Sequence, residues 1–147
     1  MPYQSATIGR VFALRWLTPP EPKDLKALGV ELTEARKRSG QPLISLSILP
    51  DSLSVPDMSI RKDMEHFNKV WSETCDSIHV IVAGEGFKNS IMRSVVSALA
   101  IAASKRGLVQ VHRTFAEALE KICETDEIDT VQLRLRLTNL KLLDGVP

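Results

Sequence analysis

The run Ile-His-Val-Ile-Val-Ala at residues 78–83 constrains the fold of this chain more than any other segment. Apolar residues, most of them β-branched, occupy both its odd and its even positions. A strand with this composition is suited to burial on both faces, and such strands occur mainly in parallel sheets that are covered by helices. The run therefore predicts an interior strand of an α/β fold.

The rest of the chain alternates between strand-like and helix-like segments. We expect strands at residues 7–17, 43–49, 78–83 and 108–112, and amphipathic helices at residues 24–39, 57–74, 88–106 and after Thr114. We expect the core to include Val80, Val82, Val95 and Leu99. This alternation favours an α/β domain over residues 5–125, with a single open, mostly parallel sheet and right-handed crossovers.

Composition excludes several classes of protein. The chain has 147 residues, of which 44% are hydrophobic and 25% charged, as in a globular domain and unlike a disordered tail. A net charge of +1 and an aromatic content of 5% provide neither a basic field nor a stacking platform for nucleic acid. We expect no membrane span and no secretory signal, and we expect Cys75 and Cys123 to be reduced thiols in the cytoplasm.

A glycine turn follows the most apolar strand and precedes a predicted helix. Open α/β sheets bind ligands at such places, because backbone N–H groups point outward there. The dinucleotide motif is incomplete, because Asn89 occupies its third glycine position, and no phosphate loop is present. A plain tight turn remains one explanation. The other is a partner- or anion-binding site that comprises Gly84, Gly86, Lys88, Ser90, Arg93 and Ser97.

No other motif predicts a reaction. His66, His79 and His112 lack the spacing of metal ligands, although His79 and His112 would lie close together if their strands were neighbours. No nucleophile elbow is present. We therefore expect no metal, no cofactor and no catalytic residue.

Charge is distributed unevenly in the second half of the chain. Residues 86–116 contain basic side chains and no acid, whereas residues 117–129 are strongly acidic. One explanation is that basic side chains stabilise the C-terminal end of a helix and that acidic and basic side chains pair within the chain. The other is a docking surface of two signs that steers a protein partner.

Residues 126–147 form a C-terminal extension in this interpretation. Leu133, Leu135 and Leu137 alternate with two arginines, which predicts a half-buried strand. Such a strand must pair with a sheet edge, in its own chain or in a neighbouring copy. We therefore expect an edge strand or an oligomerisation arm that contributes to a homodimer.

The order of the segments resembles the SpoIIAA-like fold, a superfamily that includes STAS domains and the lipid-binding CRAL-TRIO domains. The resemblance covers residues 7–124 and rests on order and spacing, with the pieces KRSG, LISLSILPD, IHVIVAGEGF and VQVHRTFAEALEKI. STAS anti-sigma-factor antagonists carry a phosphorylatable serine in a D-S-S-G-like turn. The corresponding turn here reads AGEGFKNS, in which Ser90 is the nearest match.

The resemblance implies a non-catalytic, bacterial-type regulatory or scaffolding module of the cytoplasm that binds a protein partner. A small-molecule or lipid carrier is the first alternative, by analogy with the CRAL-TRIO relatives. The second alternative is an enzyme that acts on an anionic substrate at the glycine turn. It would need an acid–base pair there, formed by Glu85 with His79 or His112.

Overall fold

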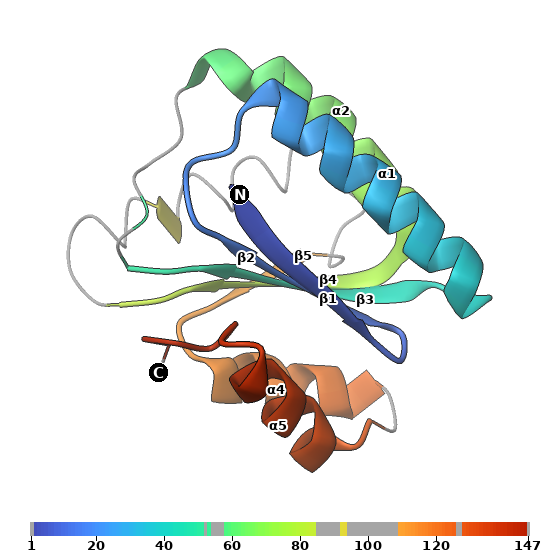
Figure 1. Ribbon diagram of the computed structural model, residues 1–147, viewed down its shortest axis with the longest axis vertical. Helices are drawn as coiled ribbons and strands as arrows, with labels where there is room; N and C mark the ends of the chain where they lie inside the picture. The colour runs from blue at the N-terminus through green and yellow to red at the C-terminus, as the bar shows by residue number, and fades with distance from the viewer. Residues whose placement is uncertain are drawn as a thin grey trace.

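A five-stranded mixed sheet forms the centre of the molecule (Figure 1). The computed structural model describes residues 2–51, 53, 58–84, 92–93, 109–125 and 128–146. The strands lie in sequence order, and β1 is antiparallel to β2 whereas the other neighbours are parallel. They are β1 (Tyr3–Ile8), β2 (Val11–Trp16), β3 (Leu43–Leu49), β4 (Cys75–Val82) and β5 (Val109–His112). The predicted α/β class with a mostly parallel sheet is confirmed.

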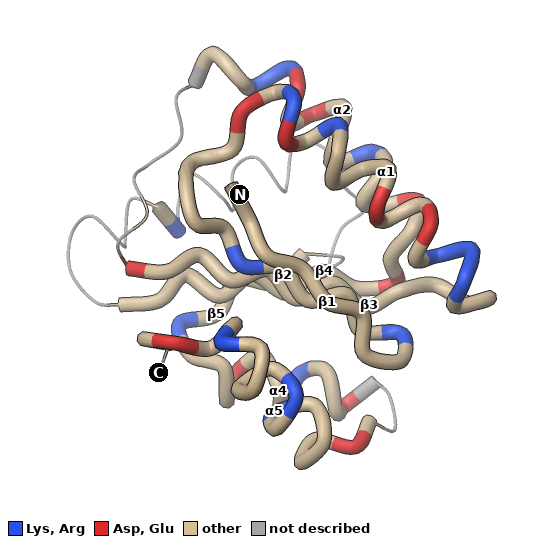
Figure 2. The backbone as a smooth tube through the Cα atoms, in the orientation of Figure 1, with Lys and Arg blue, Asp and Glu red and all other residues tan. Residues whose placement is uncertain are grey.

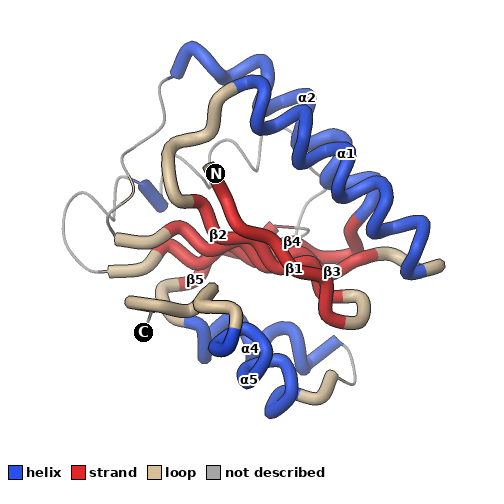
Figure 3. The backbone as a smooth tube through the Cα atoms, in the orientation of Figure 1, coloured by secondary structure: helices blue, strands red, loops and turns tan. Residues whose placement is uncertain are grey.

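Helices cover both faces of the sheet (Figures 1 and 3). One layer contains α1 (Pro22–Ser39) and α2 (Arg61–Thr74), with the short 3-10 helix η1 (Met58–Ile60) before α2. The other layer contains α4 (Phe115–Thr125) and α5 (Thr130–Asn139). Thr114 caps the start of α4, because its Oγ1 accepts a hydrogen bond from the Glu117 N–H at 3.2 Å.

The interior strands explain why two layers are needed. Ile44, Leu46 and Ile48 of β3 pack in the cluster that includes α4 and α5, whereas Val80 and Val82 of β4 pack in the cluster that includes α1 and α2. The predicted burial of Val80 and Val82 is confirmed, at 3% and 1% exposed. The other two predicted core positions, Val95 and Leu99, lie outside the described residues.

The N-terminal segment corrects one expectation. A single strand over residues 7–17 is wrong, because β1 and β2 form a hairpin in which Ile8 pairs with Val11. Gly9 occupies the turn at φ 60°, a backbone conformation that glycine adopts without steric cost. Pairing of β1 with β2 extends the sheet by one strand beyond the parallel part.

The C-terminal segment corrects a second expectation from the sequence. The predicted edge strand is wrong, because residues 130–139 form the helix α5. Leu133 and Leu137 are four residues apart, so they share one helical face, and both are buried against the sheet-facing cluster. Leu135 points away and is 50% exposed. The strand that was expected to pair with a neighbouring copy does not form.

Truncation of Leu137 tests this packing. Leu137→Ala removes a fully buried side chain and should lower the free energy of unfolding by about 2–5 kcal/mol, through lost apolar transfer and a cavity. Leu135→Ala is the matched control and should change it by less than about 0.5 kcal/mol. Urea unfolding of the two variants measures the difference. Equal losses would show that α5 does not pack by this face.

Candidate functional site

The turn predicted to bind a partner begins where β4 ends. Gly84 has a φ of 95°, which favours glycine. Arg93 Nη1 donates hydrogen bonds to the carbonyl oxygens of Gly84, at 3.2 Å, and Val82, at 3.5 Å. This guanidinium therefore caps the end of β4. The remaining predicted members of the site lie outside the described residues: Gly86, Lys88, Ser90 and Ser97.

Two histidines that are distant in sequence meet on the sheet. His79 on β4 shares the face of Ile81, which packs with α4, because side chains alternate along a strand. Its Nδ1 lies 3.1 Å from Nε2 of His112 on the neighbouring strand β5. The two rings stack with their centroids 5.3 Å apart. The predicted proximity of His79 and His112 is confirmed.

Burial determines the chemistry of this pair. Burial, together with the smaller effect of the neighbouring His112, lowers the pKa of His79 to about 4. Burial also lowers the pKa of His112, against the opposing effect of Glu117. At neutral pH both rings are therefore neutral, and one N–H donates to the other ring. His79 is 1% exposed, so its ring has no access to a substrate, and the pair stabilises the packing of β5 beside β4.

Among the described residues, no further side chain completes a metal site with the pair. Across the part of the chain that the structure describes, no group of three or more His, Cys, Asp or Glu side chains could hold a metal ion. Cys75 is buried in β4, Cys123 is exposed on α4, and both are free. Burial raises the pKa of the Cys75 thiol to about 12, so this thiol is not a nucleophile at neutral pH.

Acid should destabilise the fold through the histidine pair. The pKa of His79 is about 4 in the folded chain and about 6.5 when unfolded, so the unfolded chain binds more protons between these values. Stability should therefore fall as the pH falls from about 6.5 to about 4, by about 3 kcal/mol in total. Urea unfolding between about pH 5 and pH 7 measures the slope, above the range in which most carboxylates titrate. His79→Gln should reduce it, and an unchanged slope would contradict the assignment.

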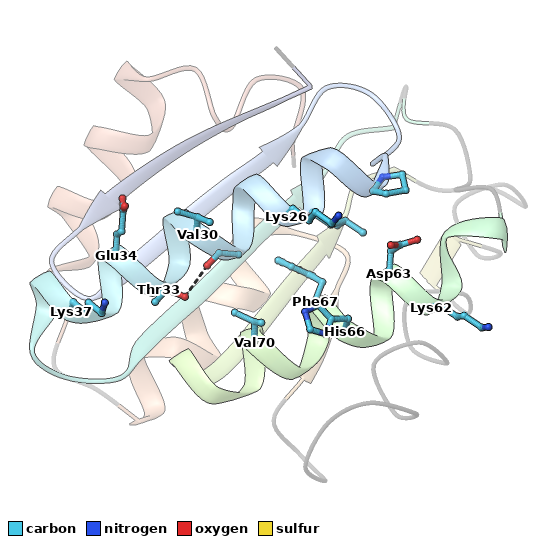
Figure 4. Close-up of a pocket in the computed structure, with 13 residues that line it drawn as sticks. Lys26, Val30, Thr33, Glu34, Lys37, Lys62, Asp63, His66, Phe67 and Val70 are labelled. Atoms are coloured by element: carbon cyan, nitrogen blue, oxygen red, sulfur yellow. Dashed lines mark hydrogen bonds between the residues drawn. The ribbon is translucent and has the colours of Figure 1, made fainter.

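An open groove of about 690 Å³ separates α1 from α2 on the outer side of their layer (Figure 4). Leu25 and Gly29 of α1 and Phe67 and Val70 of α2 line it. At the edge of the groove, Val30 exposes 59% of its surface, although it lies in the middle of a helix. The groove therefore offers an accessible apolar surface to a protein or to a small molecule.

Gly29 lines this groove in the middle of α1. A Cβ at this position would meet only Val70 Cγ1, at 3.9 Å, which is an ordinary van der Waals contact. Alanine would therefore fit, yet glycine in a helix interior costs about 0.5–1 kcal/mol relative to alanine. Departures from local preference without a structural need concentrate at functional sites. We identify the α1–α2 groove as the candidate functional site for this reason.

Charged side chains of both signs surround the groove. Figure 2 shows blue and red segments interspersed along both helices. The lysines are Lys26, Lys37 and Lys62, and the acids are Glu34 and Asp63. An apolar centre with a polar rim is the usual anatomy of a surface that binds another protein. Charges of both signs favour a partner whose own rim is mixed, which excludes a simple polyanion.

Sequence reasoning missed this groove. Its two signals were a glycine inside a helical pattern and a valine, Val30, on the polar side of that pattern. Each is common by itself. Only the packing of α1 beside α2 places Gly29 opposite Val70 and joins the two signals.

Comparison with protein-family models, with curated proteins and with solved structures finds no match. Among the described residues, no helix combines the length and the apolar character that crossing a membrane requires.

Replacing Gly29 tests the cost that we assign to it. Gly29→Ala should raise the free energy of unfolding by about 0.5–1 kcal/mol, because alanine favours the helix and meets no close neighbour. Gly40→Ala is the control and should lower it, because Gly40 ends α1 at φ 69°. Chemical denaturation of both variants measures these changes in the free energy of unfolding. Destabilisation by Gly29→Ala would mean that the glycine serves packing and not the groove.

Proposed function

We propose that this chain is a non-catalytic regulatory or scaffolding module that binds a protein partner through the α1–α2 groove. The observation that carries the proposal is an apolar groove lined by Gly29, a glycine inside a helix at a position where alanine would fit. The exposure of Val30 supplies an apolar contact for the partner, and the mixed rim charges supply specificity more than affinity.

The alternatives have less support among the described residues. A lipid carrier would need an enclosed apolar cavity, whereas side chains of two core clusters pack against the two faces of the sheet. An enzyme at the glycine turn would need His79 or His112 as its base, whereas these two rings bond to each other in a buried position. Both observations favour binding over transport or catalysis.

We further propose that the fold is SpoIIAA-like and that the module works in the cytoplasm. The sheet supports the fold assignment, because each strand after the hairpin joins the sheet next to the strand before it. The two free cysteines agree with a reducing compartment.

A matched pair of valine variants tests the binding function. Val30→Glu places a charge at the groove, whereas Val131→Glu places it on α5, in the other helix layer, at a site that is 71% exposed. The tagged wild type and both variants are purified from the organism's own cells, and copurifying proteins are quantified by mass spectrometry. A partner should be retained by Val131→Glu and reduced about tenfold by Val30→Glu, because a buried unpaired charge is costly at an interface.

Two results would overturn the proposal. The first is a set of copurifying proteins that is the same for all three chains. The second is a stoichiometric lipid or metabolite in the purified wild type, which would favour the carrier. Circular dichroism and thermal melting of the variants serve as the folding control, because both valines are exposed and neither change should unfold the chain.

A further inference from the structure

The free edge of β1 lacks the features that normally prevent strand pairing. β1 is an outer strand of the sheet, and its sequence Tyr-Gln-Ser-Ala-Thr-Ile contains no charged residue and no proline. It pairs with β2 over all of its residues without a shift of register. Proteins usually protect an outer strand with charge, proline or a bulge. The β1 edge is therefore open to the addition of another strand.

The register shows which backbone groups face outward. In an antiparallel pair, residues that bond to the neighbouring strand alternate with residues that do not. The Leu17 N–H donates to the Pro2 carbonyl at 2.8 Å, and the turn closes on Ile8 and Val11. Even-numbered residues of β1 therefore bond to β2. The N–H and C=O groups of Tyr3, Ser5 and Thr7 point away from the sheet.

A groove of about 640 Å³ follows the first half of this edge. Its floor is Pro2–Ser5, one wall is formed by Asp24, Ala27 and Glu31 of α1, and the other wall is formed by Leu140 and Leu142 after α5. It lies on the opposite side of α1 from the α1–α2 groove, with which it shares no lining residue. The two surfaces can therefore be tested independently.

The two walls differ in chemistry. On the α1 side, the Glu31 carboxylate accepts hydrogen bonds from the Tyr3 hydroxyl and, at 2.9 Å, from the Ser5 hydroxyl. Asp24 also lines this wall, but it is buried and its carboxylate accepts a hydrogen bond from the Glu21 N–H at 3.0 Å, so Glu31 is the acid that the wall offers to a partner. On the other side, Leu140 is exposed and apolar. Arg15 of β2 holds that wall in place by donating to the Leu142 carbonyl at 3.1 Å.

We propose that an extended segment of a partner protein adds to the sheet along the β1 edge, with basic and apolar residues in alternation. Its backbone pairs with the outward groups of Tyr3, Ser5 and Thr7, as in other cases of strand addition. Side chains of a strand alternate between its two faces. Its lysines or arginines then face Glu31, while its apolar residues face Leu140.

Charge excludes a second copy of this chain as the occupant. Twofold pairing centred on Ser5 would place two β1 strands about 4.8 Å apart. Each strand carries Glu31 above Ser5, so two like-charged carboxylates would meet across the junction. A basic strand brings the opposite charge to the same place.

The probe is a synthetic peptide of about eight alternating valine and lysine residues, long enough to pair along β1. Its counterpart alternates valine with glutamate. Binding to the full chain is measured by fluorescence anisotropy, and exchange of the Ser5 and Thr7 amides is followed by NMR. The lysine peptide should bind about tenfold or more tightly than the glutamate peptide and should slow both amides.

Three variants locate the binding. Ser5→Pro removes an outward N–H and should weaken binding of the lysine peptide about tenfold or more, because proline on an outer strand blocks pairing only on its free side. Ser5→Ala is its control, because it loses the same hydroxyl contact with Glu31 but keeps the N–H, and it should bind nearly as the wild type. Glu31→Gln should weaken the lysine peptide selectively, and it tests the proposal even if Ser5→Pro does not fold.

Several results would overturn the proposal. These are equal binding of the two peptides, no slowing of the Ser5 and Thr7 amides, or lysine-peptide binding that Glu31→Gln leaves unchanged. A wild-type dimer in light scattering that Ser5→Pro converts to monomer would assign the edge to a second copy instead. None of these results depends on Val30, so they do not test the proposed function of the α1–α2 groove, which is tested separately.

Discussion

Both faces of β3 and β4 are buried, and each face needs a layer of helices to exclude water. The cluster around Leu43 and Val80 is closed by α1 and α2, whereas the cluster around Ile44 and Ile81 is closed by α4 and α5. The C-terminal residues are therefore part of the core that covers the sheet. A strand at residues 130–139 would have left that face with fewer apolar side chains against it, which gives the helix its advantage.

The position of α1 produces both proposed binding surfaces. One flank of this helix meets α2 only in part, because Gly29 leaves space opposite Val70. The other flank overhangs β1, where Glu31 stands above Ser5. The inner face of α1 packs in the core, where Leu28 is fully buried. A single helix thus contributes to the core on one side and lines a groove on each of two others.

The histidine pair shows how a buried polar contact is accommodated. Each ring satisfies one nitrogen of the other, and His79 Nε2 remains buried without a hydrogen-bond partner. Burial of an unsatisfied nitrogen costs stability, and burial of a charged ring would cost more. The pair is therefore compatible with the fold only while both rings are neutral. This links the contact between β4 and β5 to pH.

Local chemistry in the sequence determined much of the fold, because apolar spacing and caps act over a few residues. It located β3 at residues 43–49 and the end of α1 at Gly40, and it placed His79 and His112 on strands. It failed at residues 7–17, where Gly9 turns the chain, and at residues 130–139, where leucines two and four apart fit a strand and a helix alike. Only the tertiary structure decided that His79 touches His112, that Gly29 lies opposite Val70 and that Glu31 stands over Ser5. These contacts depend on the order of the strands in the sheet and on the packing of the helices. A local sequence pattern contains neither of these.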